Sequence, residues 1–261
     1  MLQPLLTRAT FDAVLFDLDG VITPTATLHA LSWQQMFDPF LAARYAEGIA
    51  KLSQTPALPS TIASWHPLDL DQDYKRYLDG RIRYEAVAAF LASRQISLPY
   101  GTPNDEPGYD TICALGNLKD KLFETLLQSE DLQAYPGSIT LIEYCRAQEF
   151  AIAVVSSSRN CEQVLTRIGI RDWFPVRIDG KVAEQLHLPG KPAPDTYLTA
   201  AERLGVAPQR AVVIEDAIVG VQAGRAGQFG LVVGVDRHGD PDRLWQQGAD
   251  RVVQDLAELV P

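Results

Sequence analysis

Four short apolar segments, and their spacing, constrain the fold of this chain most strongly. Each is bounded by turn or polar residues, and they cover residues 13–16, 152–155, 211–214 and 231–233. Segments this short and this uniformly apolar are typical of strands buried on both faces of a sheet. The last three alternate with helix-like segments at residues 160–168, 194–204 and 218–225. This alternation predicts an α/β fold with a doubly wound, mainly parallel sheet.

The first and second apolar segments are separated by more than a hundred residues, which is too many for a simple crossover. This stretch contains no convincing strand pattern, and its apolar spacing predicts helices at residues 29–47, 84–94 and 117–128. Pro-rich polar loops interrupt it at residues 53–60 and 98–108. We therefore predict an α-helical cap domain at residues 25–130, inserted into a core formed by residues 1–24 and 131–261.

The composition limits the classes of partner. Of the 261 residues, 46% are hydrophobic and 21% are charged, which is typical of a soluble globular protein with a sizeable core. The net charge of -10 disfavours binding to nucleic acid and to anionic membranes over most of the surface. An anionic substrate must therefore bind at a local basic patch.

The cysteines and the N-terminal residues bear on the compartment. Cys113, Cys145 and Cys161 lie far apart, and this spacing predicts neither a disulfide framework nor a zinc site. The first ten residues lack the pattern of a signal peptide, and no apolar stretch approaches the roughly 18 residues of a membrane span. These features predict a cytoplasmic protein. They leave the oligomeric state open, and a monomer is compatible with them.

Polar side chains follow three of the predicted strands. Asp17 and Asp19 come after the first, Ser156 after the second, and Glu215-Asp216 after the third. Ligands bind beyond the carboxyl ends of the strands in open parallel sheets, so we expect these side chains to converge at one edge. Asp17, Asp19, Glu215 and Asp216 would then form an oxygen-rich site of the kind that Mg²⁺ prefers.

A lysine between the second and third of these positions completes the pattern. Lys191 lies in Gly190-Lys191-Pro192-Ala193-Pro194-Asp195, where Pro192 favours an extended conformation for the lysine. A carboxylate that attacks a phosphate dianion needs positive charge and hydrogen-bond donors on the phosphoryl oxygens. Mg²⁺, Lys191 and Ser156 would supply them. These residues predict phosphoryl transfer, with Asp17 as nucleophile and Asp19 as general acid and base.

The motifs resemble those of the haloacid dehalogenase superfamily of phosphotransferases. The four signatures of that superfamily match Asp17-Leu18-Asp19-Gly20-Val21-Ile22-Thr23, Ser156, Lys191 and Glu215-Asp216, in that order. The resemblance covers the whole predicted core. It implies a core of the haloacid dehalogenase type, a Mg²⁺ cofactor and a phospho-Asp17 intermediate.

Residues outside the four signatures resemble the β-phosphoglucomutase branch. Thr25 and His29 match a Thr-x-x-x-His segment that leads into the cap and couples its closure to the acid/base aspartate. The resemblance implies that the non-transferring phosphate binds Arg83 in the Asp79-Gly80-Arg81-Ile82-Arg83 loop. The full set that it implies to contact a sugar phosphate is Thr25, His29, Trp33, Gly80, Arg83, Lys119, Ser158, Arg159 and Asn160. Pro24 departs from the acidic residue common at that position, and the segment at residues 96–113 makes the cap longer.

Several of these residues could have purely structural roles instead of functional ones. Asp-x-Asp-Gly alone is a frequent turn, and Glu215 could cap the following helix. His29 could be an ordinary interfacial histidine, and Arg83 and Lys119 could be solvated helix charges. Ser157 and the histidines His66, His187 and His238 are expected to have structural or surface roles only.

Three functions are compatible with these residues. The resemblance favours a β-phosphoglucomutase of carbohydrate metabolism, which interconverts β-glucose 1-phosphate and glucose 6-phosphate through a bisphosphate intermediate. A Mg²⁺-dependent sugar-phosphate phosphatase would use the same core and differ in whether water reaches the phosphoenzyme. A catalytically silent sugar-phosphate-binding regulator is the third, and the intact Asp17 and Asp19 argue against it.

Overall fold

The structure is a computed structural model of the chain, and it describes residues 5–52, 66–237 and 239–261. The chain forms two compact units. The first comprises Met1–Ala26, Gly80–Ile82 and Asp131–Pro261, and the second comprises Thr27–Asp79 and Arg83–Glu130. This division differs from the sequence-based boundaries mainly at Gly80–Ile82, which groups with the first unit although it lies within the segment expected to form the cap.

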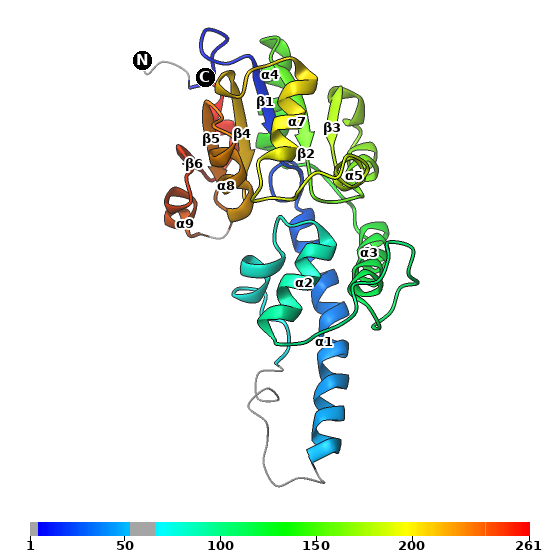
Figure 1. Cartoon of the computed structure of the whole chain (residues 1–261). Helices are drawn as coiled ribbons and strands as arrows, with labels where there is room; N and C mark the ends of the chain where they lie inside the picture. Colours follow the sequence, from blue (N-terminus) through cyan, green and yellow to red (C-terminus); the bar gives the residue numbers. More distant parts are fainter. Residues whose placement is uncertain (1–4, 53–65, 238) are drawn as a thin grey trace. The chain divides into compact units, whose positions relative to one another are not determined.

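The first unit contains a six-stranded parallel sheet (Figure 1). Its order is β3 (Val176–Ile178), β2 (Ala151–Val155), β1 (Ala13–Phe16), β4 (Ala211–Glu215), β5 (Leu231–Val235) and β6 (Arg251–Val253). Strands β2 and β3 lie on one side of β1, and β4, β5 and β6 lie on the other, so the strand order reverses at β1. This arrangement confirms the predicted α/β class and the doubly wound parallel sheet.

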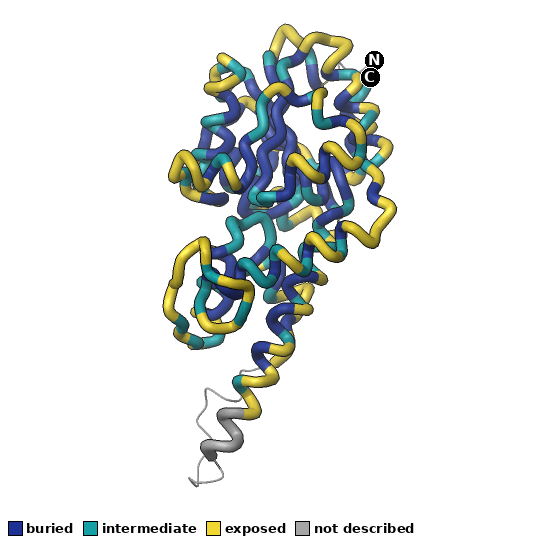
Figure 2. Tube along the Cα trace, turned by 90° about the vertical axis from the view of Figure 1, so that its right-hand side faces the viewer, coloured by how far each residue is buried: buried dark blue, intermediate teal, exposed yellow. Residues whose placement is uncertain are grey.

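The register of the three central strands positions the ends that carry polar residues. Phe16 of β1 lies opposite Val154 of β2 and Ile214 of β4. The next residues are therefore Asp17 after β1, Val155 in β2 and Glu215 in β4. Every residue of these three strands is buried except Ala151 of β2, and dark blue marks the buried residues along the tube in Figure 2. The sheet thus presents Asp17 and Glu215 side by side at its carboxyl edge.

Strands β3 and β6 were missed by the sequence analysis. Each has only three residues, and each includes an arginine, Arg177 or Arg251. Both strands lie at the edges of the sheet, where one side is not covered by another strand. Their partly exposed residues do not form the uniformly apolar segments by which buried strands are recognised.

Helices surround the sheet, and α7 (Asp195–Leu204) packs against β1, β2 and β3. Its buried face includes Tyr197, Ala200 and Ala201. The helix ends at Gly205, which has a φ of 70° that a residue without a side chain adopts easily. The remaining helices of this unit are α4 (Pro136–Ala147), α5 (Cys161–Arg167), α6 (Gly180–Gln185), α8 (Ile218–Ala226) and α9 (Pro241–Gln246).

The second unit is helical in its described part, as the sequence predicted for this segment. It contains α1 (Thr25–Leu52, whose first two residues belong to the first unit), a short π-helix (Tyr74–Leu78), α2 (Arg83–Ser93) and α3 (Ile112–Ser129). Helix α3 begins five residues earlier than predicted because Thr111 caps it, accepting a hydrogen bond from the Ala114 amide at 2.9 Å. Aromatic residues form the core, including Trp33, Phe37 and Phe90. The predicted loop at residues 53–60 lies outside the described residues.

None of the described helices combines the length and the apolar character that a membrane crossing requires.

Candidate active site

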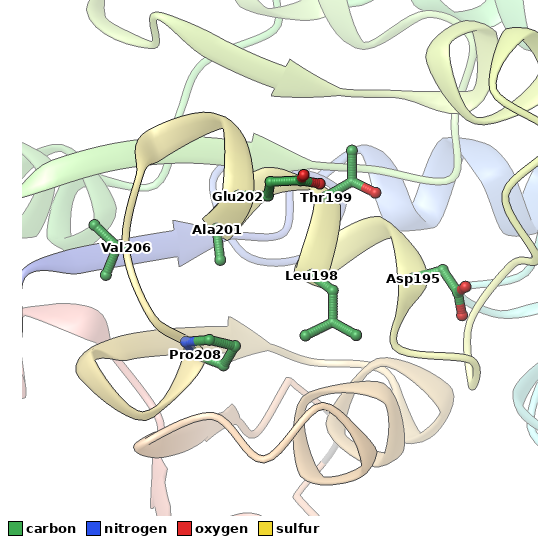
Figure 3. A pocket seen from close by; sticks show the side chains of 7 residues that line it. All are labelled: Asp195, Leu198, Thr199, Ala201, Glu202, Val206 and Pro208. Atoms are coloured by element: carbon green, nitrogen blue, oxygen red, sulfur yellow. The ribbon is translucent and has the colours of Figure 1, made fainter.

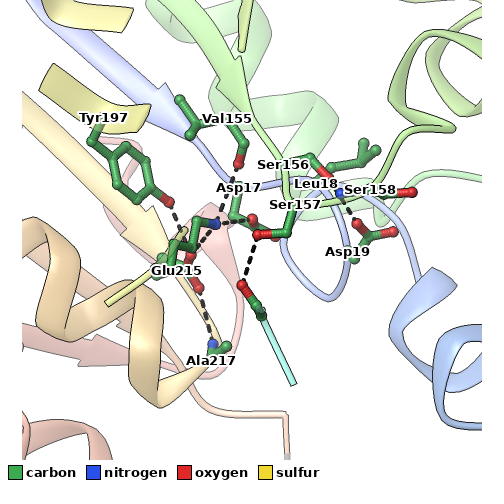
Figure 4. A network of polar contacts seen from close by, with 12 residues as sticks. Asp17, Leu18, Asp19, Val155, Ser156, Ser157, Ser158, Tyr197, Glu215 and Ala217 are labelled. Atoms are coloured by element: carbon green, nitrogen blue, oxygen red, sulfur yellow. Dashed lines mark hydrogen bonds and ion pairs between the residues drawn. The ribbon is translucent and has the colours of Figure 1, made fainter. Parts of the chain in front are cut away.

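Asp17 lies directly after β1, and only 6% of it is exposed. Its amide donates to the Ile214 carbonyl at 2.9 Å, so the strand pairing with β4 continues through this residue. Asp17 Oδ1 accepts a hydrogen bond from Lys191 Nζ at 2.5 Å (Figure 4). The carboxylate is therefore held in place by backbone and side-chain contacts, and its role as nucleophile stays a prediction.

Lys191 lies between two carboxylates and is 1% exposed. Its Nζ donates to Glu215 Oε1 at 2.5 Å as well as to Asp17. The peptide bond between Lys191 and Pro192 is cis. The structure thus brings Lys191 to the predicted nucleophile from a loop 174 residues away in sequence.

Glu215 makes more contacts than a simple helix cap would. Tyr197 donates from its hydroxyl to Oε1 at 2.9 Å, and the Ala217 amide donates to Oε2 at 3.0 Å. Together with Lys191, these donors occupy both oxygens of a side chain that is completely buried. The Ala217 amide belongs to the residue before α8 (Ile218–Ala226), so Glu215 contacts the start of this helix without accepting from an amide of its first turn.

The charges in this cluster affect one another. Burial alone would lower the pKa of Lys191, but Asp17 and Glu215 outweigh that effect and raise the pKa above its ordinary value. Lys191 is therefore an ammonium. Burial raises the pKa of Asp17 well above its usual range, with Glu215 and Asp19 adding to the effect and Lys191 opposing it. Additional positive charge at this position would favour the ionised, nucleophilic form of Asp17.

Three of the four predicted metal ligands converge. Asp17, Glu215 and Asp216 each place a carboxylate oxygen within 4.8 Å of the others. A site built from carboxylate oxygens, without nitrogen or sulfur, suits Mg²⁺. The carboxylate of Asp19 lies outside this group and is hydrogen-bonded elsewhere, so its role as a metal ligand stays a prediction.

Asp19 is held by two hydroxyl groups. Thr25 donates to Oδ1 at 2.5 Å, and Ser156 donates to Oδ2 at 3.0 Å. A direct hydrogen bond therefore joins Thr25 to Asp19, whereas the coupling of cap closure to this aspartate stays a prediction. Ser156 was expected to neutralise a phosphoryl oxygen, whereas here its hydroxyl hydrogen is directed to Asp19. The hydroxyl must rotate to contact a phosphoryl group, and that role stays a prediction.

The segment after Ser156 folds back on itself. The Ser158 amide donates to Ser156 Oγ at 3.0 Å, and the Asn160 amide donates to Ser158 Oγ at 3.2 Å. Arg159 forms an ion pair with Glu184. Ser157 donates to the Gly80 carbonyl at 2.7 Å, which connects Gly80–Ile82 to the first unit. Ser158, Arg159, Asn160 and Gly80 thus belong to the same unit as the carboxylate cluster.

Three predicted substrate contacts lie together in the second unit. Lys119, 4% exposed, has its Nζ 2.5 Å from His29 Nδ1 and 5.0 Å from the centre of the Trp33 ring. His29 stacks on Phe123, with ring centres 3.9 Å apart. Trp33 is buried in the core of this unit. The simpler reading of Lys119 as a solvated helix charge is therefore wrong, since it is buried among aromatic rings.

Arg83 has several partners within the second unit. Its Nη1 donates to Asp120 at 2.5 Å, and its Nη2 donates to Tyr84 at 2.7 Å and to Asn117 at 2.9 Å. Asn117 in turn donates to two carbonyls of the preceding loop, those of Pro103 and Asp105. The long cap segment is thus anchored through Arg83, and the predicted contact of Arg83 with a phosphate stays a prediction.

Two residues of the cluster were missed by the sequence analysis, Tyr197 and Gly220. A Cβ at Gly220 would lie 1.7 Å from Glu215 Oε1, so helix α8 can pass the carboxylate only because this residue has no side chain. The sequence signal was a pair of glycines, Gly220 and Gly224, within a helical pattern, where glycine is unfavourable and usually has a packing reason. Tyr197 has no comparable signal, because one aromatic residue on the buried face of a helix is ordinary.

Replacing Gly220 by alanine is expected to displace the Glu215 carboxylate. The substitution should lower the free energy of unfolding by about 1–3 kcal/mol, as overpacking in a core does. Urea denaturation measures this change. Gly108→Ala is the control, because a Cβ there meets nothing closer than 3.8 Å. Equal stabilities of the two variants would mean that Glu215 does not need the space at Gly220.

A surface hollow on the first unit is separate from these residues (Figure 3). It has a volume of about 320 Å³ and is lined by residues of α7 and the loop after it: Asp195, Leu198, Thr199, Ala201, Glu202, Val206 and Pro208. No residue predicted to bind substrate or metal is among them. The arrangement that can perform chemistry is the carboxylate cluster.

This chain is similar to known proteins over most of its length. The family model of haloacid dehalogenase-like hydrolases matches residues 11–228. The β-phosphoglucomutase of Mycobacterium bovis is 43% identical over 251 residues, which cover 95% of this chain and 91% of that protein. The β-phosphoglucomutase of Bacillus subtilis is 31% identical over 251 residues, with the same coverage.

A solved structure supports the fold. The crystal structure of a β-phosphoglucomutase from Clostridium difficile has a TM-score of 0.69 and covers 95% of this chain and 93% of that chain. Its sequence identity is 23%, so it bears on the fold alone. With the family match and the relatives above, the chain belongs to the haloacid dehalogenase superfamily and to its β-phosphoglucomutase-like subfamily.

Proposed function

We propose that the protein is a β-phosphoglucomutase that interconverts β-glucose 1-phosphate and glucose 6-phosphate. The observation that carries this proposal is the 43% identity to the Mycobacterium bovis β-phosphoglucomutase over nearly the whole of both chains. The contacts among Asp17, Lys191 and Glu215 support it, because they assemble a nucleophile and its positive charge in a buried cluster. The identity favours the mutase, and the cluster also suits a phosphatase.

The proposed cycle starts with a phosphoryl group on Asp17. The 6-hydroxyl of β-glucose 1-phosphate attacks the phosphorus, Asp19 accepts the hydroxyl proton, and the bond from phosphorus to Asp17 breaks. The resulting bisphosphate then presents its other phosphate to Asp17. Asp17 attacks that phosphorus, Asp19 returns the proton to the departing 1-oxygen, and glucose 6-phosphate leaves. The phosphoenzyme is restored, so atoms and charge balance over the cycle.

The residues of the cluster have distinct proposed tasks. Asp17, Glu215 and Asp216, with Asp19, would hold Mg²⁺, which supplies positive charge to the transferring phosphoryl group. Lys191 adds a second positive charge beside Asp17, and Ser156 adds a hydroxyl donor. Thr25 orients Asp19 through the hydrogen bond already described, which remains when the Ser156 hydroxyl rotates to the phosphoryl group.

The proposed sugar-phosphate contacts are those that the resemblance to β-phosphoglucomutases implies. Ser158, Arg159, Asn160, Gly80 and Thr25 belong to the first unit of the chain. His29, Trp33, Arg83 and Lys119 belong to the second. In this proposal the residues of the second unit act as a cap domain that recognises the sugar and the non-transferring phosphate. The alternative is a sugar-phosphate phosphatase, in which water replaces the sugar hydroxyl as the acceptor.

One assay separates the two functions. The purified protein is incubated with Mg²⁺, β-glucose 1-phosphate and a trace of glucose 1,6-bisphosphate, and both glucose 6-phosphate and inorganic phosphate are followed. We expect glucose 6-phosphate to form with little phosphate release. Phosphate release without isomerisation would identify a phosphatase, and binding without turnover would identify a regulator. The α-anomer is the matched control substrate, and the mutase should discriminate against it.

A further inference from the structure

The loop that carries Asp19 is closed by its own hydrogen bonds. The amides of Ile22 and Thr23 donate to the Leu18 carbonyl at 2.9 and 3.0 Å, and the Gly20 amide donates to the Thr23 carbonyl at 2.7 Å. Gly20 has a φ of +91°, which a residue with a side chain rarely adopts. This turn leaves the carbonyls of Gly20, Val21 and Ile22 to be satisfied by other parts of the chain.

Those carbonyls are bound from two other segments. Tyr135 donates its amide to the Ile22 carbonyl at 2.9 Å, and Ser138 donates its hydroxyl to the Val21 carbonyl at 2.7 Å. The third donor is Arg237, which follows β5. Its Nε donates to the Gly20 carbonyl at 2.7 Å, and its Nη2 lies 3.5 Å from the Val21 carbonyl.

The guanidinium of Arg237 is fixed on its other sides as well. Its Nη1 donates to the Gln254 carbonyl at 3.1 Å, at the end of β6. Its central carbon lies 3.8 Å from the centre of the Tyr135 ring. A planar cation with several donors suits this combination of carbonyls and an aromatic face, and the point charge of a lysine does not. Arg237 therefore braces the Asp19 loop against the β5–β6 side of the sheet.

The Asp19 loop contacts the carboxylate cluster where Gly20 lies against Asp216. A Cβ at Gly20 would lie 1.8 Å from Asp216 Oδ2, so the backbone of this residue is packed directly against the Asp216 carboxylate. Asp19 is the preceding residue. A displacement of Gly20 by a few tenths of an ångström is thus transmitted both to Asp216 and to Asp19, since close-packed groups cannot absorb it.

We propose that Arg237 is a positioning residue that sets the place of the Asp19–Gly20 loop, and through it the geometry of Asp216 in the metal site. Arg237 touches neither Asp19 nor a reacting group in this arrangement. Its effect on catalysis rests on the proposed phosphoryl transfer, whereas its effect on metal binding depends on the carboxylate cluster alone.

The test is the Arg237→Lys variant, in which the charge remains and the planar fork is lost. We expect its affinity for Mn²⁺, measured by electron paramagnetic resonance without substrate, to fall at least about tenfold, as for other groups that orient metal ligands. The turnover number kcat should fall by a similar factor, also of about tenfold or more, while KM for the sugar phosphate changes little.

The matched control is Arg177→Lys. Arg177 is half-buried and also donates to backbone carbonyls, those of Arg171 and Phe174, but at the edge strand β3. The Mn²⁺ affinity of the Arg177→Lys variant should stay within about twofold of the affinity of the unaltered protein. An Arg237→Lys variant that melts at a lower temperature but keeps Mn²⁺ affinity and kcat would overturn the proposal and leave Arg237 a purely structural role. If the unaltered protein lacks mutase activity and the Arg237→Lys variant binds Mn²⁺ more weakly than the unaltered protein, the proposed function is rejected and the positioning role of Arg237 is retained.

Discussion

Replacing Asp17 by asparagine is expected to abolish the phosphoenzyme and to lower kcat on the order of 10⁶-fold, the size of loss found when a covalent nucleophile is removed. The amide has nearly the shape of the carboxylate but is not a nucleophile. The fold should tolerate the change, because the variant removes a buried charge whose pKa is already raised by burial and by Glu215. Lys191 retains Glu215 as a charged partner.

Acid-quench mass spectrometry after incubation with glucose 1,6-bisphosphate detects the added phosphoryl group directly. Asp12→Asn is the control, because Asp12 lies at the opposite end of β1 and pairs with Arg210. Asp19→Asn gives a second comparison, since it should slow turnover strongly and still leave the nucleophile and substrate binding intact. A fully active Asp17→Asn enzyme would show that another group accepts the phosphoryl group.

Replacing Lys191 by methionine is expected to be costly for both stability and activity. The ammonium is 1% exposed and lies between Asp17 and Glu215, so its loss leaves two buried carboxylates facing each other. Breaking a buried ion pair from one side lowers the free energy of unfolding by about 3–5 kcal/mol. The loss of a positive group from the phosphoryl site should lower kcat by about 100- to 1,000-fold.

Urea denaturation measures the loss in free energy of unfolding. A chelator is present, because a bound cation would otherwise replace part of the missing charge. Lys181→Met is the control, since Lys181 is exposed on α6. The double variant Lys191→Met with Glu215→Gln gives a sharper comparison. It should be more stable than Lys191→Met alone, although Glu215→Gln alone should be less stable than the unaltered protein. Additive losses in the double variant would mean that charge repulsion is not the cause.

The central strands and the candidate nucleophile could be predicted because their signals are local. Uniformly apolar segments identified β1, β2, β4 and β5, and the polar residues that follow them identified the carboxyl edge. The parallel register then explains why Asp17 and Glu215 lie side by side. Strands β3 and β6 gave no such signal, because an edge strand of three residues with an arginine is not apolar.

The partners of the predicted residues were harder to predict. Ser156 donates to Asp19, 137 positions away, and Arg83 forms an ion pair with Asp120, 37 positions away. No local pattern in the sequence indicates either partner, because only folding brings them close. The phosphate contacts expected of Ser156 and Arg83 stay predictions.

The sequence by itself determined the α/β class, the helical nature of the inserted segment and the identity of the acidic and basic residues at the strand ends. These features depend on residue type and on short-range periodicity. The tertiary structure decided which groups come into contact. Lys191 lies between Asp17 and Glu215, Gly220 lies against the Glu215 carboxylate, and Arg237 binds the loop that carries Asp19. These contacts of Lys191 and Arg237 join residues 24 to 217 positions apart, and only the packing of helices and strands around the sheet specifies them. Gly220 and Glu215 are close in sequence, but their contact depends on how α8 packs beside the end of β4.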